Sequence, residues 1–222
     1  MLEARDLVVR YGSATALDGV SLSLEAREMV ALVGPNGAGK TTLVNTLTGV
    51  LRPAGGSVRI EGRLTQVPEG RQLFGELTVE DNLRLGAWRS KRRDAGRVYE
   101  ILPELRRLAR QRAETLSGGE QQMVAVGRAL MSDPDILAID ELSLGLAPKI
   151  VASLASHLRT LNREHGVGVL LIEQNARLAF DLCERAYVME VGRIVADGPC
   201  GELMRSPSVQ RAYLGGLGEE AS

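Results

Sequence analysis

The feature that most constrains this chain is a glycine-rich segment at residues 34–42 (GPNGAGKTT), which follows an apolar run at 29–33 (MVALV) and precedes a helix-forming stretch. Glycine lets the backbone wrap around an anion with its N–H groups turned inward, and the helix start adds positive potential. A tight glycine-rich turn would need no Lys-Thr pair at this register. The segment therefore predicts a loop that binds the phosphates of a nucleotide.

Each residue of this segment is a candidate for contact with the nucleotide. Lys40 is expected to reach the β- and γ-phosphates, and the hydroxyl of Thr41 is expected to hold Mg²⁺. Arginine supplies almost all of the 27 basic residues, so a lysine at this register points to a specific chemical role. The predicted nucleotide-binding residues of the segment are Gly34, Pro35, Asn36, Gly37, Ala38, Gly39, Lys40, Thr41 and Thr42.

Two acidic residues, Asp140 and Glu141, follow a second apolar run at 136–139. A strand that emerges into solvent would give the same pattern by itself. In a chain that also carries a phosphate loop, the pattern favours Asp140 as a Mg²⁺ ligand and Glu141 as the general base that polarises the attacking water. Successive residues of a strand point to opposite sides, so the two carboxylates can take different roles.

A third motif is the segment LSGGEQQ at residues 116–122. Ser117 and Glu120 have the spacing of a capping box that opens a helix. A cap does not require two glycines directly after it, and Gly118 and Gly119 leave backbone N–H groups bare to form a second anion-binding helix start. Residues 34–42 already account for the phosphates of one nucleotide. This second surface is therefore expected to serve a nucleotide held by another subunit.

Composition excludes several classes of protein. Hydrophobic residues make up 44% of the 222 residues and charged residues 25%, and the net charge is −1. These values exclude a disordered tail protein and argue against a whole-surface nucleic-acid binder. The longest apolar runs are far shorter than a membrane span, and the first residues lack the apolar region of a signal peptide. Cys183 and Cys200 are too far apart for a redox or zinc motif, so we expect reduced structural thiols.

Short apolar runs alternate with helix-length amphipathic segments along the chain, which indicates an α/β fold. Runs at 7–10 and 20–24 predict an N-terminal antiparallel layer, and runs at 58–60 and 64–67 predict a second strand pair. Near the end, 186–190 and 193–196 predict a hairpin. We expect one nucleotide-binding domain over residues 1–222, with a small helical subdomain at about 78–115 inserted into it.

Together these motifs resemble the ATP-binding cassette (ABC) family, and the resemblance covers essentially the whole chain. It implies a P-loop NTPase fold of the ABC type, ATP and Mg²⁺ as cofactors, ATP hydrolysis, and a head-to-tail dimer. Ser117, Gly118, Gly119 and Glu120 would then close over the γ-phosphate held by the partner. Tyr11 falls where the family places the aromatic ring that stacks on adenine, and a strand-edge tyrosine that packs locally is the alternative.

Longer segments narrow the resemblance to one subfamily. The segments VPEGRQLFGELTVEDNL, LSGGEQQMVAVGRALMSDP, SLGLAP, EQNARLA and RAYLGG resemble the ATP-binding subunits of branched-chain amino-acid uptake systems. This resemblance implies a peripheral protein at the cytoplasmic face of the cell membrane, bound to permease subunits and to no nucleic acid. The second ATPase subunit is expected to be an unlike chain, and a homodimer remains the alternative.

Several positions depart from the family pattern, and two of them, Glu69 and Gln174, belong to the predicted site. Glu69 stands where most cassettes have the glutamine that contacts Mg²⁺ and the permease, and Gln66 is the weaker alternative. Gln174 replaces the usual switch histidine; it can hydrogen-bond a γ-phosphate oxygen but cannot shuttle a proton near neutral pH. His157 and His165 are interpreted as surface residues that do not replace it. The chain between residues 40 and 117 is also shorter than in relatives. The helical subdomain in this stretch is expected to touch the permease, so the shortening concerns the permease contact more than nucleotide binding.

Two other functions stay open at this point. The chain could serve a transporter for another solute, an exporter included, or it could be a soluble cassette ATPase that acts on DNA or ribosomes. Soluble cassettes usually fuse two cassettes or carry a long coiled coil, and neither is seen in this sequence. A GTPase would need an N-K-x-D motif to read the base, and a small-molecule kinase would not need the LSGGEQQ segment.

Overall fold

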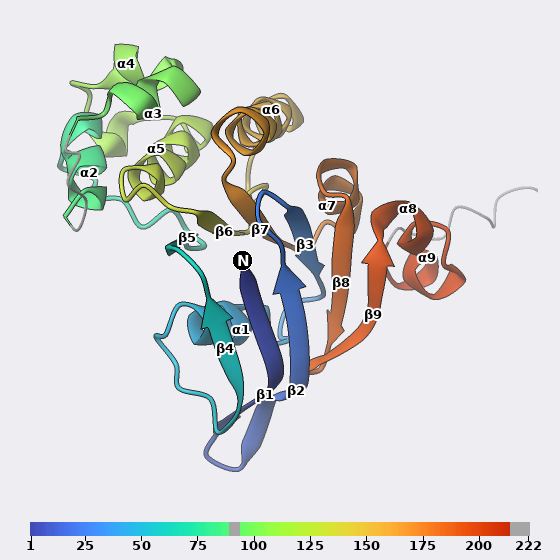
Figure 1. Cartoon of the computed structure of the whole chain (residues 1–222). Helices are drawn as coiled ribbons and strands as arrows, with labels where there is room; N and C mark the ends of the chain where they lie inside the picture. Colours follow the sequence, from blue (N-terminus) through green and yellow to red (C-terminus); the bar gives the residue numbers. More distant parts are fainter. Residues whose placement is uncertain (89–93, 214–222) are drawn as a thin grey trace, which may run out of the picture. The chain divides into compact units, whose positions relative to one another are not determined.

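The computed structural model describes residues 1–88 and 94–213, which fall into two compact units. The first unit joins residues 1–61 to the described chain from Leu170 onward, and the second covers residues 62–169. Figure 1 labels the helices and strands of both units. Lys91 and the end of the RAYLGG segment lie outside the described residues.

The first unit contains a three-stranded antiparallel sheet in the order β2-β1-β4. Leu7, Val9 and Leu17 are buried on one face of it, which is the alternation expected of strands with one face on a core. The predicted N-terminal antiparallel layer is therefore confirmed, with longer strands than the apolar runs suggested. The strands are β1 (Leu2–Tyr11), β2 (Ala14–Leu24) and β4 (Gly55–Ile60).

The first unit also contains a mixed sheet. β3 (Met29–Val33) runs parallel to β8 (Arg185–Glu190), and β8 pairs antiparallel with β9 (Arg193–Pro199). Every residue of β3 is buried, which agrees with its uninterrupted apolar sequence. β7 (Gly168–Glu173) begins in the second unit and ends in the first. The helices of the unit are α1 (Lys40–Leu47), α7 (Ala176–Leu182), α8 (Cys200–Leu203) and α9 (Pro207–Tyr213).

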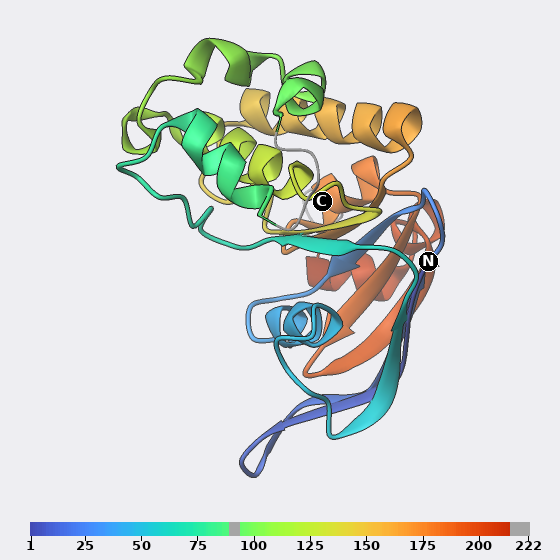
Figure 2. The same cartoon turned by 60° about the vertical axis from the view of Figure 1, so that its left-hand side comes forward.

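The second unit pairs β5 (Leu64–Val67) in parallel with β6 (Ile136–Asp140). Figures 1 and 2 both show α2 lying alongside α5. Gly86 permits this packing, because a Cβ there would collide with the backbone carbonyl of Arg128. The helical elements are α2 (Val79–Gly86), α3 (Gly96–Ile101), α4 (Glu104–Leu108), the 3₁₀ turn η1 (Ala113–Thr115), α5 (Gly118–Leu130) and α6 (Pro148–His165).

The structure corrects one strand pairing. The runs at 58–60 and 64–67 do not pair with each other, because β4 pairs with β1 and β5 pairs with β6. An apolar run predicts a strand, but it does not specify the partner strand. The hairpin predicted at 186–190 and 193–196 is confirmed. Small helices follow α2 within the expected subdomain, and its boundaries at about 78 and 115 stay a prediction.

Both cysteines have the environment expected of structural thiols. Cys183 and Cys200 are buried thiols that form no disulfide. Burial raises the pKa of Cys200 to about 11, so its thiol stays protonated and unreactive at neutral pH. None of the helices within residues 1–88 and 94–213 has the length and apolarity needed to cross a bilayer.

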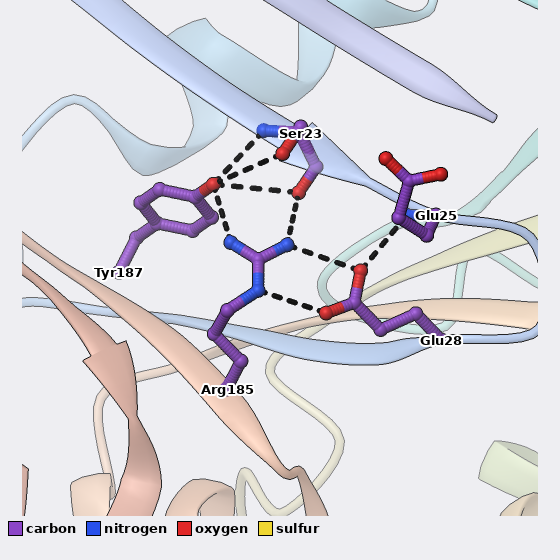
Figure 3. Close-up of polar contacts among 5 residues, drawn as sticks. All are labelled: Ser23, Glu25, Glu28, Arg185 and Tyr187. Carbon is purple, nitrogen blue, oxygen red and sulfur yellow. Dashed lines mark hydrogen bonds and ion pairs between the residues drawn. The ribbon is translucent and has the colours of Figure 1, made fainter. Parts of the chain in front are cut away.

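A part-buried ion pair connects the strands of the first unit (Figure 3). Arg185, at the start of β8, donates to the two carboxylate oxygens of Glu28 at 2.8 and 3.0 Å. Its guanidinium also donates to the carbonyl oxygen of Ser23 at 2.8 Å and to the Tyr187 hydroxyl at 2.5 Å. Burial alone would raise the pKa of Glu28, but the bonds from Arg185 outweigh it and the pKa is lowered. The cluster ties the end of β2 to β8.

Replacing Glu28 with Gln should lower the free energy of unfolding at pH 7 by about 2 kcal/mol, because it removes the charged acceptor of Arg185. A carboxyl whose pKa is lowered by folding stabilises the folded state above its unfolded pKa, and this contribution is lost as pH falls through the folded pKa. The difference between parent and Glu28→Gln should therefore shrink as the pH falls below about 5. Urea unfolding curves at several pH values measure it.

Glu61→Gln is the matched control for this prediction. Glu61 pairs with Arg59 on the surface, where their side chains are 53% and 69% exposed. The control should change stability by less than about 0.5 kcal/mol. Equal losses for the two variants, or a pH-independent difference for Glu28→Gln, would contradict the assigned role of the ion pair.

Candidate active site

The loop between β3 and α1 carries the predicted phosphate-binding residues. Its backbone turns through two left-handed glycines, Gly37 with a φ of 80° and Gly39 with a φ of 105°. Lys40 opens α1, and its Nζ donates to the carbonyl oxygens of Gly34 and Pro35 at 2.8 and 3.1 Å. Only 5% of Lys40 is exposed. Its ammonium group therefore lies against the loop that is expected to hold the phosphates.

Two glycines of this loop are required by close packing of backbones. A Cβ on Gly34 would collide with the carbonyl oxygen of Met189. A Cβ on Gly39 would lie 2.9 Å from the carbonyl oxygen of Ala16 and 2.9 Å from Cε of Met189. Gly37 has open space at the same position. Gly34 and Gly39 thus allow a close approach, whereas Gly37 supplies the turn.

The start of α1 presents backbone N–H groups to a ligand. Gly39 occupies the N-cap position and has no side chain that could accept from them. Uncapped N–H groups at a helix start form the usual protein site for an anion. Pro35, Asn36 and Thr41 are exposed, Thr42 is half-buried, and Ala38 is buried. The motif therefore folds into one loop that a polyphosphate can reach from solvent.

Two further predicted residues of the first unit lie outside this loop. Tyr11 ends β1 opposite Ala14 and is 52% exposed. Gln174 is exposed and directly follows β7. The next residue, Asn175, caps α7 by accepting from the N–H of Leu178 at 3.2 Å. Both predicted side chains are accessible to a ligand, and their roles stay predictions.

The two acidic residues of the second unit stand at the end of β6. All five residues of this strand are buried, and Asp140, the last of them, is 2% exposed. Glu141 follows with a φ of 53°. Such a left-handed conformation costs a non-glycine residue about 1–3 kcal/mol and is typical of functional sites. The backbone thus gives the two carboxylates different surroundings, one buried and one half-buried.

Each unit, taken by itself, carries an oxygen donor of the kind that Mg²⁺ binds. Within the described part of the chain, no three His, Cys, Asp or Glu side chains gather into a metal-binding group. Magnesium commonly takes one or two protein oxygens and completes its shell with phosphate oxygens and water. The hydroxyl of Thr41 and the carboxylate of Asp140 are oxygen donors of this kind.

Ser117 and Glu120 form the predicted capping box at the start of α5. The Ser117 hydroxyl oxygen accepts from the Glu120 N–H at 3.4 Å, and a Glu120 carboxylate oxygen accepts from the Ser117 N–H at 3.0 Å. The Ser117 hydroxyl also donates to the same carboxylate oxygen at 2.8 Å, and the bonds from the Ser117 N–H and, second, from its hydroxyl lower the pKa of Glu120. Glu120 therefore holds Ser117 in place.

The two glycines that follow have different surroundings. A Cβ on Gly119 would collide with Cγ2 of Ile150 in α6. A Cβ on Gly118 would lie 3.1 Å from the guanidinium of Arg71, which is flexible enough to move. Gly119 is thus required by packing within the second unit, and Gly118 is not.

The segment after β5 holds the two candidates for the Mg²⁺ and permease contact. Gln66 lies within β5, and Glu69 is exposed in the following loop. Arg71 and Gln72 come next with φ values of 63° and 47°, and Arg128 of α5 donates to their carbonyl oxygens at 3.1 and 2.7 Å. This contact could not be predicted, because backbone acceptors and left-handed non-glycine residues leave no sequence pattern.

His157, interpreted above as a surface residue, is partly exposed and contacts another helix. Its side chain is 19% exposed, and its Nε2 lies 3.3 Å from Oε1 of Glu104 in α4. The helical period of residues 148–165 shows which face is apolar, but it does not show that the helical subdomain also covers His157. His165 is half-buried at the end of α6.

The buried strand, the glycine-rich loop with its lysine, and the second buried strand that ends in two acids define a P-loop nucleoside triphosphatase. The sequence pattern of the ABC transporter family matches residues 17–143. The chain belongs to this family and is an ATP-binding and ATP-hydrolysing cassette.

Relatives of known role match nearly the full length. The chain is 45% identical to the high-affinity branched-chain amino acid transport ATP-binding protein BraG of Pseudomonas aeruginosa, over 97% of this chain and 100% of that protein. It is 33% identical to the high-affinity branched-chain amino acid transport ATP-binding protein BraF of the same organism, over 97% of this chain and 98% of that protein.

Solved structures confirm the predicted α/β cassette fold. The ADP conformation of an ATP-binding cassette of an ABC transporter gives a TM-score of 0.84 at 28% identity, covering 97% of this chain and 98% of that one. A dimeric structure of a bacterial ABC transporter cassette gives a TM-score of 0.81 at 25% identity, covering 90% and 99%.

The packing at the start of α5 predicts opposite effects for two neighbouring substitutions. Gly119→Ala should lower the free energy of unfolding by about 1–3 kcal/mol, because its methyl group overlaps Ile150. Gly118→Ala should be neutral or stabilising, because alanine favours a helix and Arg71 can move. Urea unfolding of both variants measures the difference.

A double-mutant cycle with Ile150→Ala separates the collision from other effects. This change removes the Cγ2 atom, so the cost of Gly119→Ala should largely vanish in its background. A cost that persists without Ile150, or an equal cost for Gly118→Ala, would contradict the steric explanation.

Proposed function

We propose that the chain is the ATP-hydrolysing subunit of an importer for branched-chain amino acids. The observation that carries the proposal is the 45% identity to BraG over 97% of this chain and all of that protein. Similarity of this extent includes the region at about 78–115, which is expected to face a permease, as well as the motifs that bind ATP. A peripheral position at the cytoplasmic face of the membrane, through permease subunits, is part of the proposal.

The phosphates of ATP are proposed to bind the backbone N–H groups of residues 34–42 and the ammonium group of Lys40. Lys40 would exchange its bonds to the carbonyls of Gly34 and Pro35 for bonds to phosphate oxygens. The exposed ring of Tyr11 would stack on adenine. Thr41, Asp140 and Glu69 are the proposed oxygen donors for Mg²⁺, which when bound offsets the charge of the phosphates.

Glu141 is the proposed general base. Its carboxylate would accept a proton from the water that attacks the γ-phosphate, and its half-buried position leaves it in reach of water. Its left-handed backbone turns the side chain away from the regular course of the strand. The amide of Gln174 would donate to an oxygen of the γ-phosphate.

The start of α5 is proposed to close over ATP held by a second cassette. Ser117 would contribute its hydroxyl, and Gly118 and Gly119 would contribute bare backbone N–H groups. Glu120 acts through its bonds to Ser117. The partner cassette is proposed to be an unlike chain, and a second copy can take its place in isolation.

Replacing Glu141 with Gln should lower ATP hydrolysis by at least about 100-fold, because the amide cannot accept the proton. ATP binding should remain, and the variant should accumulate as a dimer with ATP in size-exclusion chromatography. Glu164→Gln, on the exposed side of α6, is the control and should hydrolyse ATP at the parental rate. Parental turnover by Glu141→Gln would refute its assignment as the base.

The assignment of branched-chain amino acids as the transported solute can be tested in the organism that encodes the chain. Deletion of its gene should abolish uptake of radiolabelled leucine, isoleucine and valine, and the parental gene or Glu164→Gln should restore it. Glu141→Gln should not restore uptake. If deletion leaves uptake of these amino acids unchanged, the importer assignment fails while the ATPase activity stands.

A further inference from the structure

Three segments of the first unit meet at a point where only backbone atoms fit. The carbonyl oxygen of Ala16, in β2, would lie 2.9 Å from a Cβ on Gly39 and 2.6 Å from a Cβ on Gly192. Gly39 belongs to the phosphate loop, and Gly192 belongs to the turn between β8 and β9. A side chain at either position would have to move the main chain.

Hydrogen bonds connect this turn to both neighbouring segments. The N–H of Gly192 donates to the carbonyl oxygen of Ala38 at 2.8 Å. The carbonyl oxygen of Gly192 accepts from the N–H of Asp18, in β2, at 2.9 Å. Just before the turn, Met189 is fully buried and lies against the positions of Gly34 and Gly39. The end of β8 therefore contacts the phosphate loop at Gly34 and Gly39, and the turn that follows contacts it at Ala38.

The bond to Ala38 sets the direction of the next N–H group. The peptide between Ala38 and Gly39 is trans, and in a planar trans peptide the N–H points opposite to the C=O. With the carbonyl held by Gly192, the N–H of Gly39 points away from the β8–β9 turn. Gly39 is the N-cap of α1, a position whose neighbouring N–H groups bind anions.

The conformation of the turn is not the one that its own sequence favours. Val191 has a φ of 42° and is 88% exposed. β-branched residues strongly avoid this region, and Asn, Asp or Gly is preferred in hairpin turns of this kind. A valine side chain in solvent gains no packing in return. The contacts of Gly192 with β2 and with the phosphate loop therefore hold the turn in place.

We propose that Gly192 is a positioning residue for ATP binding: its N–H holds the carbonyl of Ala38, so that the N–H of Gly39 is directed toward the phosphates. This inference rests on the proposed phosphate-binding role of residues 34–42. The phosphate-loop motif does not include Gly192, which lies far along the chain from it.

Gly192→Ala tests this inference, because its methyl group meets the Ala16 carbonyl and displaces the donor. We expect the Kd for ATP, titrated with the full-length protein, to rise about tenfold, as for the loss of one hydrogen bond. The kcat at saturating ATP should stay within about threefold, because the catalytic acids are not altered. A purely structural role would lower stability and leave the Kd unchanged.

Gly49→Ala is the matched control. Gly49 has a φ of 77° and Gly192 a φ of 75°, but a Cβ on Gly49 meets no atom within 4 Å. The control therefore imposes the same backbone strain without the collision. It should lower stability and leave the Kd for ATP within about twofold.

A backbone ester covers the case in which Gly192→Ala does not fold. Glycolic acid at position 192 replaces the amide N–H by oxygen and changes no side chain, so the same rise in Kd is expected. An unchanged Kd in a folded Gly192 variant, or an equal rise for Gly49→Ala, would overturn the inference. If the parent protein does not bind ATP, the proposed function itself fails.

Discussion

The position of the phosphate loop depends on contacts between backbones that leave no room for a side chain. Gly34 lies against Met189, and Gly39 lies against Ala16. Because protein interiors are closely packed and transmit small displacements, the strands that carry Ala16 and Met189 determine where the loop lies. The bond from Arg185 to the carbonyl oxygen of Ser23 ties the same two strands together at their other ends, and Glu28 holds the guanidinium in place. Sheet register and loop position are thus coupled within the first unit.

The two glycine-rich helix starts differ in how their backbone N–H groups are satisfied. α1 begins at Gly39, which offers no side-chain acceptor, so its N–H groups are left for phosphates. α5 begins with the reciprocal bonds of Ser117 and Glu120, which satisfy two N–H groups of the helix start without a ligand and do not involve those of Gly118 and Gly119. The first arrangement suits a loop that binds ATP directly. The second suits a surface that remains stable in solvent until a partner brings a nucleotide.

Local sequence signals were sufficient for much of the fold. The buried strand at 29–33, the capping box at 117–120 and the hairpin around 191–192 each depend on neighbouring residues, and each was predicted. Strand partners depend on distant segments, which explains why the pairing of 58–60 with 64–67 was wrong. The contact between His157 and Glu104 could not be predicted for the same reason, since Glu104 belongs to a different helix.

The candidate site shows the same limit. Residue types and spacing predict roles for Lys40, Asp140 and Glu141, because the proposed chemistry requires those side chains. The left-handed backbone of Glu141 and the contacts of Gly192 could not be predicted. Both involve main-chain geometry imposed by packing, and glycine or glutamate in the sequence does not reveal it.

The phosphate loop of one cassette and Ser117 of another are proposed to act on the same ATP. Mixing a Lys40→Ala variant with a Ser117→Arg variant tests this sharing of one nucleotide. Each variant alone should be inactive, and an equal mixture should recover up to about a quarter of the parental ATPase activity, since half of the dimers would contain one intact site. Full activity of Ser117→Arg alone, or no recovery in a mixture that forms dimers and binds ATP, would contradict the claim.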